Sequence, residues 1–478
     1  MQLFGCASQL SILALHAVGK YVSGLLVQLV ATSLHPDVRH IRMHYVLDAC
    51  SKLREVISGV PSSLANELTI RLLEFVDLTY KDLKESKLYS GLDEVVEMVV
   101  GAILHPSTTR LENCRENPAA HFEYSFVYLY PIIFKILIQL NSLKVLKLGR
   151  LGAEMKWFVF NIGENLEEFS CMGCSDNVLR ALSKSCNKLK CLNIKYPYIT
   201  SDAVQSILKF RKLELLNIEH SQITEDDVTK ILEGLALTDL NDKGNITKSS
   251  HILRNFGCSG LTSTHIRLLV EHFPNLTCLS LSNCRASNLD TLECLKYLTN
   301  LSLASIPLFK AKDLLQRIGK QLVSLSIDKV CGTDLHYIYD NCPSLQYFRL
   351  IFDDSPMGLG IPGGLSVLEY LKRLRLHDIR SLSFLEISVN DPKLLYYIVF
   401  RNINLRKLYV LNNNNLNVEI LLKHNVHKHL EEYYRQETGL RYTRAKVFEH
   451  YVYLKTFNFR NGKEDVSRYT CPLNHIIK

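Results

Sequence analysis

The chain has 478 residues, of which 47% are hydrophobic and 22% are charged, and its formal net charge is +8. This balance is that of a folded protein and excludes a disordered chain. Basic and acidic residues are mixed along the sequence without a clustered Lys/Arg stripe, so we expect no nucleic-acid partner.

The 14 cysteines are scattered through a large chain, and several, such as Cys171 and Cys191, lie inside apolar runs. We interpret them as reduced, buried thiols. The first twenty residues lack a basic segment ahead of their apolar stretch, and Pro131 and Lys135 interrupt the apolar segment 126–140. We therefore expect no signal peptide, no membrane partner, and a cytoplasmic or alternatively nuclear localisation.

Residues 1–141 have apolar residues at helical spacing, which predicts an all-helical N-terminal segment. One amphipathic stretch runs from Leu10 to Leu29 and a second from Leu64 to Val76. Pro61 stands just ahead of the second stretch, where the first turn of a helix tolerates a missing N–H. The simplest interpretation is that these helices cover the apolar end of the following domain.

The same helices resemble the adaptor-binding boxes of two ubiquitin-ligase families. Residues 60–73 are similar to the opening helix of an F-box, although the tryptophan of that motif is absent and the only tryptophan is Trp157. Alternatively, the pair of boxes in zygotic leucine-rich-repeat receptors of cullin ligases is similar to two short sets of residues. The candidate adaptor-binding residues are Leu10, Val18, Val60, Pro61, Leu64 and Leu68, with Ala14 in place of the elongin-box cysteine. The resemblance implies a Skp or elongin adaptor as partner.

A repeat of the form L-x-x-L-x-L occupies residues 142–380. Its first leucines follow one another at 22 to 24 residues, apart from one step of 26 and one long gap. The nine copies start at Leu143, Leu166, Leu189, Leu213, Leu276, Leu298, Leu322, Leu345 and Leu371. Alternating apolar residues predict a short strand in each copy, and stretches such as 175–182 predict a helix after it. Because one unit cannot bury its own apolar side, the copies must stack into a solenoid.

These units resemble the cysteine-containing leucine-rich repeats (LRRs) of F-box/LRR proteins. The matching pieces are Ile199-Thr200-Ser201-Asp202 and Ile223-Thr224-Glu225-Asp226 after the strand, and Cys186-Asn187-Lys188-Leu189 and Cys342-Pro343-Ser344-Leu345 before it. The fold class implied is α/β, an LRR solenoid with a curved parallel sheet and outer helices, preceded by the helical segment.

The long gap between Leu213 and Leu276 has room for one more copy at Leu253, together with a polar surface loop over 241–250. Residues 381–478 are interpreted as degenerate C-terminal repeats and a cap. Leu405-Leu408-Val410 and Leu454-Phe457-Phe459 are the worn copies, and a helical, aromatic stretch is expected between them over 427–453.

Catalytic and metal-binding patterns are weak. The pair Cys171 and Cys174 has a spacing found in zinc sites, but no second pair accompanies it and Cys171 falls on a core position of the repeat. The glycine-rich run 358–364 contains a proline and lacks the Lys-Ser/Thr of a phosphate loop. We therefore expect no enzymatic activity, no metal and no cofactor.

Protein partners are expected on the concave strand face, at the positions between and after the apolar residues of the strands. The candidate partner-binding residues are Asn193, Lys195, Asn217, Glu219, Asp328, Arg349, Arg373, Arg375 and His377. Since the last four are basic, an acidic segment of a partner is expected on the later repeats. The alternative is a merely solvated strand face.

These observations predict a protein-binding LRR module, and the resemblance implies the substrate-receptor subunit of a cullin-type, SCF-like ubiquitin ligase. In that interpretation the helices bind the adaptor and the repeats hold a protein substrate. The alternative is an LRR interaction scaffold with no ligase role.

Overall fold

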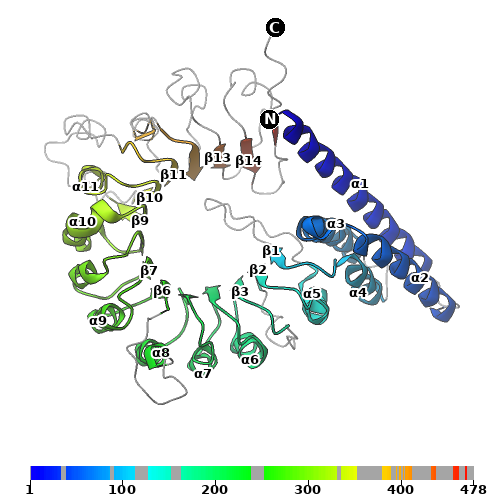
Figure 1. The fold of residues 1–478 in the computed structure, drawn as a ribbon, viewed down its shortest axis with the longest axis horizontal. Coiled ribbons are helices and arrows are strands. Elements are labelled where there is room, and N and C mark those ends of the chain that lie inside the picture. Colours follow the sequence, from blue (N-terminus) through cyan, green and yellow to red (C-terminus); the bar gives the residue numbers. More distant parts are fainter. Residues whose placement is uncertain are drawn as a thin grey trace, which may run out of the picture. The chain divides into compact units, whose positions relative to one another are not determined.

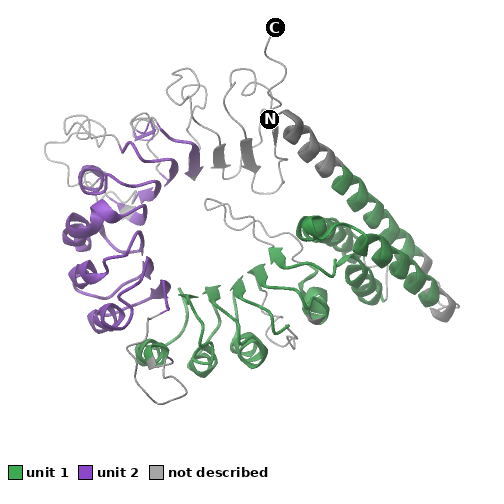
Figure 2. Cartoon of the chain, in the orientation of Figure 1, with its two compact units in different colours: residues 1–117, 122–249 green, residues 118–121, 250–478 purple. Residues whose placement is uncertain are grey.

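A computed structural model of the chain divides it into two compact units (Figure 2). Unit 1 comprises residues 1–117 and 122–249, and unit 2 comprises residues 118–121 and 250–478. The structure describes residues 2–33, 39–86, 91–112, 128–151, 163–237, 252–330, 335–352, 379–388, 404–411, 432–437, 456–461 and 469–470, and four single positions between 395 and 402.

Unit 1 begins with the predicted helical segment. Its helices are α1 (Gln2–Ser33), α2 (Arg39–Ser58), α3 (Ala65–Glu85), α4 (Leu92–Ile103) and α5 (Tyr130–Ile136), with a 3-10 turn (Ser62–Leu64) before α3. Helix α1 approaches α3 closely, because a Cβ on Gly19 would lie 2.1 Å from the ring of Phe75. Val22 and Leu26 of α1 are fully buried against this neighbour.

Helix α1 is also the only described helix long and apolar enough to cross a membrane. Its segment Ala14–Ala31 has a mean hydropathy of 1.3, and 28% of it is buried. This criterion uses only length and composition, and core helices that cross no membrane also satisfy it. One face of α1 is packed against the rest of unit 1, since Leu29 and Val30 are buried as well.

The helical segment is tied to the first strand of the sheet by side-chain hydrogen bonds. Asn66 on α3 accepts the backbone N–H groups of Thr109 and Arg110 through Oδ1, at 2.9 and 3.1 Å. The hydroxyls of Thr69 and Thr108 lie 2.9 Å apart in the interior. The N-terminal helices therefore hold the edge of the sheet in addition to covering its end.

The sheet of unit 1 is parallel and its strands pair in chain order. They are β1 (Arg110–Glu112), β2 (Val145–Arg150), β3 (Glu168–Met172), β4 (Cys191–Lys195) and β5 (Leu215–Asn217). Helices α6 (Asp176–Ser185), α7 (Asp202–Ile207) and α8 (Glu225–Leu237) follow β3, β4 and β5 and line one side of the strands (Figure 1). Strand β1 lies before the first copy of the motif, so the ladder starts one strand earlier than the pattern indicates.

Unit 2 continues the same strand–helix alternation. Its strands are β6 (Asn255–Ser259), β7 (Cys278–Ser282), β8 (Asn300–Ala304), β9 (Ser324–Val330), β10 (Tyr347–Phe352), β11 (Phe384–Ser388), β12 (Lys407–Leu411), β13 (Glu432–Glu437), β14 (Thr456–Asn461) and β15 (Tyr469–Thr470). The helices are α9 (Ser263–His272), α10 (Lys312–Ile318) and α11 (Leu335–Asn341). Between β7 and β8 a 3-10 helix (Asp290–Cys294) takes the place of the α-helix. Pairing is parallel from β6 to β14, and β15 runs antiparallel.

The leucines of the motif form the core of both units. Leu189, Leu192 and Ile194 of one copy are fully buried, and Leu345, Phe348 and Leu350 of another are too. Each such side chain contributes about 1.5–3 kcal/mol by leaving water. The helix predicted over 175–182 is confirmed as part of α6, with Val178, Leu179 and Leu182 on its buried face.

One prediction in the C-terminal half is wrong, and the degenerate copy at Leu454 is confirmed by β14. Strand β10 pairs with β9 on one edge and with β11 (384–388) on the other, while the predicted copy at Leu371 lies outside the described residues. The segment 432–437, expected to be helical, is strand β13. The extra copy at Leu253 is confirmed by β6, and the worn copy at Leu405 by β12.

Candidate functional site

The strand register of unit 1 places one polar residue of each repeat next to that of the following repeat. Here the strand face of a unit means the side of its strands that the helices leave uncovered (Figure 1). In its central row, Lys147 pairs with Ser170, Ser170 with Asn193, and Asn193 with Asn217. Burial alternates along β3 and β4, so these residues point away from the leucine core. The row predicted from the motif therefore exists, while its binding role stays a prediction.

Glu219 stands at the centre of a small polar network at the ends of β4 and β5. Its Oε2 lies 3.2 Å from Lys195 Nζ and accepts a hydrogen bond from Asn217 Nδ2 at 3.2 Å. Asn217 Oδ1 in turn accepts the backbone N–H of Glu219 at 3.0 Å. Glu219 is buried and Lys195 is partly exposed, so this network presents a tethered ammonium group rather than a carboxylate.

Asn193 lies beside this network in the central row. Its Oδ1 atom is buried and makes no hydrogen bond with any described residue. A buried polar atom without a partner costs about 1–3 kcal/mol, and native proteins rarely leave one without a reason. Because this atom has no surface open to solvent, a donor from a bound molecule reaches it only when the Asn193 side chain rotates.

Two aromatic residues that the sequence reasoning missed complete the site. Tyr196 and His220 directly follow β4 and the β5 segment, and both have positive φ angles, 49° and 60°. Their rings stack at 4.3 Å with an interplanar angle of 4°, and Tyr196 is 51% exposed. A left-handed backbone costs a residue other than glycine about 1 kcal/mol or more.

The same turn position is occupied by glycine or a small polar residue in other repeats. Gly173 and Gly260 hold it with positive φ, as do Asn283 and Ser305. Aligning the repeats one beneath another would have shown a tyrosine and a histidine where the turn prefers glycine or asparagine. That comparison is the signal by which the stacked pair could have been found.

The strand face of unit 2 differs in chemistry. Its central row contains Gly257, Ser280, Ser302, Ser326, Arg349, Glu386, Tyr409, Tyr434 and Asn458. The predicted site residue Asp328 makes a hydrogen bond within the protein, because its Oδ1 accepts the backbone N–H of Ser305. It is therefore engaged in holding a strand end.

The predicted basic surface on the later repeats can be described only at Arg349, and its binding role stays a prediction. Arg349 pairs in register with Glu386, and its Nε donates to Glu386 Oε1 at 2.9 Å. Glu386 is 1% exposed, and burial raises its pKa to about 7 although Arg349 acts in the opposite direction. The neighbour of Arg349 is thus acidic. Arg373, Arg375 and His377 lie outside the described residues.

The predicted adaptor-binding residues fall into two groups. Val18, Pro61 and Leu64 are exposed, with Val18 at 37% and Leu64 at 40%. Val60 is half-buried and its carbonyl lies 2.9 Å from His105 Nε2, while Leu68 is only 3% exposed. Leu68 therefore packs inside the helical segment and offers no surface to a partner. The side chain of Leu10 lies outside the described residues.

Most of the described cysteines are core residues, whereas Cys294 is exposed. Cys171 and Cys174 are both buried, and none of the described cysteines is in a disulfide. Burial raises the pKa of Cys186 to about 11 and that of Cys342 to about 12, so these thiols are protonated at neutral pH. Among the described residues no group of His, Cys, Asp or Glu side chains has the arrangement of a metal site.

The fold and its repeating strand register define the chain as a leucine-rich-repeat protein, an α/β solenoid with a helical segment in front of it. No family model matches the chain, and no curated protein matches it. Among solved structures it is similar to an internalin (InlF) of Listeria monocytogenes, with 13% identity, a TM-score of 0.30, and coverage of 82% of this chain and 95% of that one. It is also similar to the PEPR1–AtPEP1 structure, with 16% identity, a TM-score of 0.24, and coverage of 69% and 47%.

Proposed function

We propose that the protein is a non-catalytic receptor that holds a protein partner on the strand face of unit 1. The observation that supports this most is the clustering of three features at the ends of β4 and β5. These are the unpartnered Oδ1 of Asn193, the ammonium of Lys195, and the exposed Tyr196 ring on a strained turn. A donor in the partner would bond to Asn193, an acceptor would face Lys195, and an apolar or aromatic side chain would pack on the tyrosine. Tyrosine is among the residues that contribute most at protein interfaces.

In the finer form of the proposal, the protein is the substrate-receptor subunit of a cullin-type ubiquitin ligase. Residues 1–141 would bind a Skp or elongin adaptor, residues 142–380 would hold the substrate, and residues 381–478 would close the array. The exposed side chains of Val18 and Leu64, together with the resemblance of the repeats to F-box/LRR proteins, support this form. We place the protein in the cytoplasm or nucleus as part of the same proposal, which suits the absence of disulfides among the described cysteines.

The test of the strand-face site uses Tyr196→Gly in the full chain. Glycine removes the ring and relieves the positive φ, so we expect stability to change by less than about 1 kcal/mol. Partner capture, measured by proximity labelling and confirmed with the purified partner, is expected to fall by about tenfold or more. Ser305→Gly, at the same turn position with a φ of 55°, is the matched control and should leave capture intact. Equal capture by the two variants would exclude the site.

The ligase role needs a separate variant, because deleting the N-terminal helices would expose the buried residues of α3. Val18→Asp with Leu64→Glu changes only exposed positions, and Leu78→Glu, also on an exposed position of α3, is the control. Affinity capture of the parent chain should recover a Skp or elongin adaptor with a cullin, and the double variant should lose both. If neither adaptor is recovered while strand-face partners are retained, the alternative of an LRR scaffold with no ligase role is correct.

A further inference from the structure

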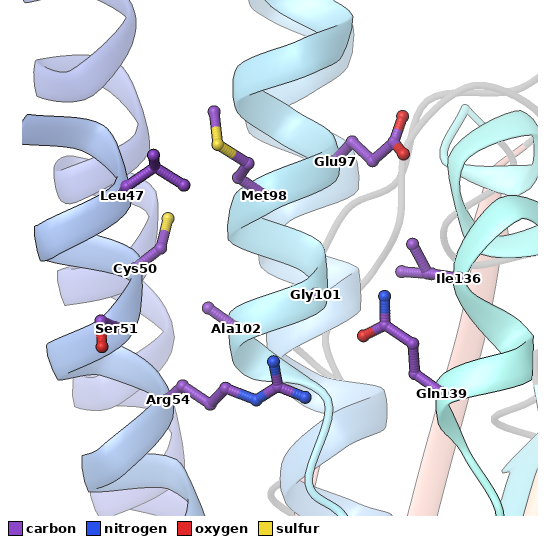
Figure 3. Close-up of a pocket in the computed structure, with 10 residues that line it drawn as sticks. All are labelled: Leu47, Cys50, Ser51, Arg54, Glu97, Met98, Gly101, Ala102, Ile136 and Gln139. Carbon is purple, nitrogen blue, oxygen red and sulfur yellow. The ribbon is translucent and has the colours of Figure 1, made fainter. Parts of the chain in front are cut away.

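A groove of about 370 Å³ opens between α2, α4 and α5 in unit 1 (Figure 3). Leu47, Cys50, Ser51 and Arg54 come from α2 on one side, and Ile136 and Gln139 stand on the other. The floor is formed by Met98, Gly101 and Ala102 of α4. The volume lies within the range of sites that bury a ligand or an anchoring side chain.

The groove exists because Gly101 lacks a side chain in the last turn of α4. Glycine destabilises a helix relative to alanine, so its presence there needs a reason. Packing does not supply one, since a Cβ on Gly101 would meet only Gln139 Oε1, at 3.9 Å. Gly19 of α1 is the opposite case, because a Cβ there would strike Phe75. The space above Gly101 is therefore open and accessible to a side chain from outside.

The charges that line the groove are unbalanced. Glu97 is paired with Lys135 at 3.0 Å, which compensates its carboxylate. Arg54 is exposed and makes no ion pair or hydrogen bond with the described residues, so its charge is the uncompensated one. Leu47, Ser51 and Arg54 are spaced by four and three residues, which puts them on one stripe of α2 about two turns long. The wall formed by α2 thus runs from the exposed side chain of Leu47 to the uncompensated charge of Arg54.

We infer that this groove binds an amphipathic helix of a partner protein, with one large apolar side chain above Gly101 and a carboxylate near Arg54. A helix laid in a groove contacts it through its own residues i, i+3, i+4 and i+7, which span about two turns, and the stripe on α2 offers a wall of that length. The apolar anchor covers Cys50 and Ala102, and the acidic residue compensates Arg54. The groove shares no residue with the strand-face site or with the exposed adaptor candidates, so this inference goes beyond the proposed function and does not depend on it.

A displayed library of alanine-based helices tests the inference on the full chain. Each clone carries Leu or Phe at one central position and Glu or Lys one or two turns to either side. We expect selected clones to carry Glu rather than Lys, and to lose about tenfold or more in affinity on Arg54→Glu. Clones in which Lys replaces Glu should regain affinity for Arg54→Glu. Arg211→Glu, an exposed cation away from the groove, is the control and should change nothing.

Gly101→Leu tests the anchor position. The leucine fills the groove from the floor, so selected clones should no longer bind, while Gly101→Ala should raise the melting temperature and retain binding. Circular dichroism shows that each variant is folded. Three results would overturn the inference: no clone binding the parent chain, clones that tolerate Gly101→Leu, or a dimer of this chain that Gly101→Leu dissociates, which would assign the groove to a second copy.

Discussion

Asp77 is a carboxyl group that this fold keeps out of water. It lies on α3 and its Oδ1 accepts the backbone N–H of Leu129 at 2.9 Å. Burial raises its pKa from 3.8 to about 7, against the lowering effect of backbone hydrogen bonds and of Lys81. Between these two values the folded chain binds a proton that the unfolded chain does not. The free energy of unfolding therefore falls as the pH rises from about 4 to 7.

Asp77→Asn should reduce this loss of stability with pH. The amide oxygen can still accept the N–H of Leu129, and there is no charge to desolvate. At pH 8 we expect the variant to be more stable than the parent by about 2 kcal/mol, less than the roughly 4 kcal/mol of the full shift because the buried amide NH₂ needs a partner. Urea unfolding at pH 5 and pH 8 measures it. Glu386, whose pKa is also raised to about 7, should retain part of the slope. Asp82→Asn, on an exposed position of the same helix, is the control for removing a carboxylate from α3.

The strand-end turn is the element in which sequence variation between repeats carries most information. Gly173 and Gly260 occupy the same turn position with φ angles of 75° and 74°. A Cβ on Gly173 would lie 2.8 Å from the carbonyl oxygen of Leu151, whereas a Cβ on Gly260 would meet nothing within 4 Å. The same backbone conformation is therefore crowded in one repeat and open in the other.

These two glycines make a matched pair for substitution by alanine. Gly260→Ala should cost about 1 kcal/mol, the strain of a left-handed alanine. Gly173→Ala should cost clearly more, about 2–4 kcal/mol, because a backbone carbonyl of the preceding repeat must move. Urea midpoints of the two variants compare them directly. Equal losses would mean that the carbonyl of Leu151 relaxes freely and that only φ matters.

The elements were predictable from sequence where one pattern had one solution. Leu189, Leu192 and Ile194 set both the core face and the register of β4, so the central polar row followed from them. After β10 the usual repeat length predicted the next strand at Leu371-Leu374-Leu376, which lies outside the described residues. The strand that pairs with β10 is 384–388, and it places Glu386 beside Arg349. Repeat spacing alone did not predict this neighbour, because spacing does not encode which strand pairs with β10.

The site was predictable only in part, because its other features depend on distant contacts and on backbone conformation. Lys195 and Glu219 were identified from their positions after the third apolar residue, but their ion pair required the pairing of β4 with β5. The stacking of Tyr196 on His220 depends on two positive φ angles, which no hydrophobic pattern encodes. The role of Gly101 in the α4 groove could not be predicted from the sequence, because it depends on the open space next to this residue in the folded chain.

At the scale of the whole molecule, an array of repeats distributes its stability among neighbours. Each repeat contacts mainly the one before and the one after it, so a defect should weaken its own region first. Phe169 in β3 and Phe348 in β10 occupy the same position of the motif, and both are fully buried. They sit in different compact units, with β3 paired to β2 and β4, and β10 paired to β9 and β11.

Phe169→Ala and Phe348→Ala should each cost about 3–5 kcal/mol, but in different places. Hydrogen exchange followed by mass spectrometry should show faster exchange in β2 to β4 for the first variant and in β9 to β11 for the second. Each variant serves as the control for the other, because the residue type, the burial and the motif position are the same. If either variant accelerated exchange equally in both sets of strands, the array would unfold as a single cooperative unit. A chain that unfolds locally can lose a partner from the strands of one unit while the strands of the other unit stay folded.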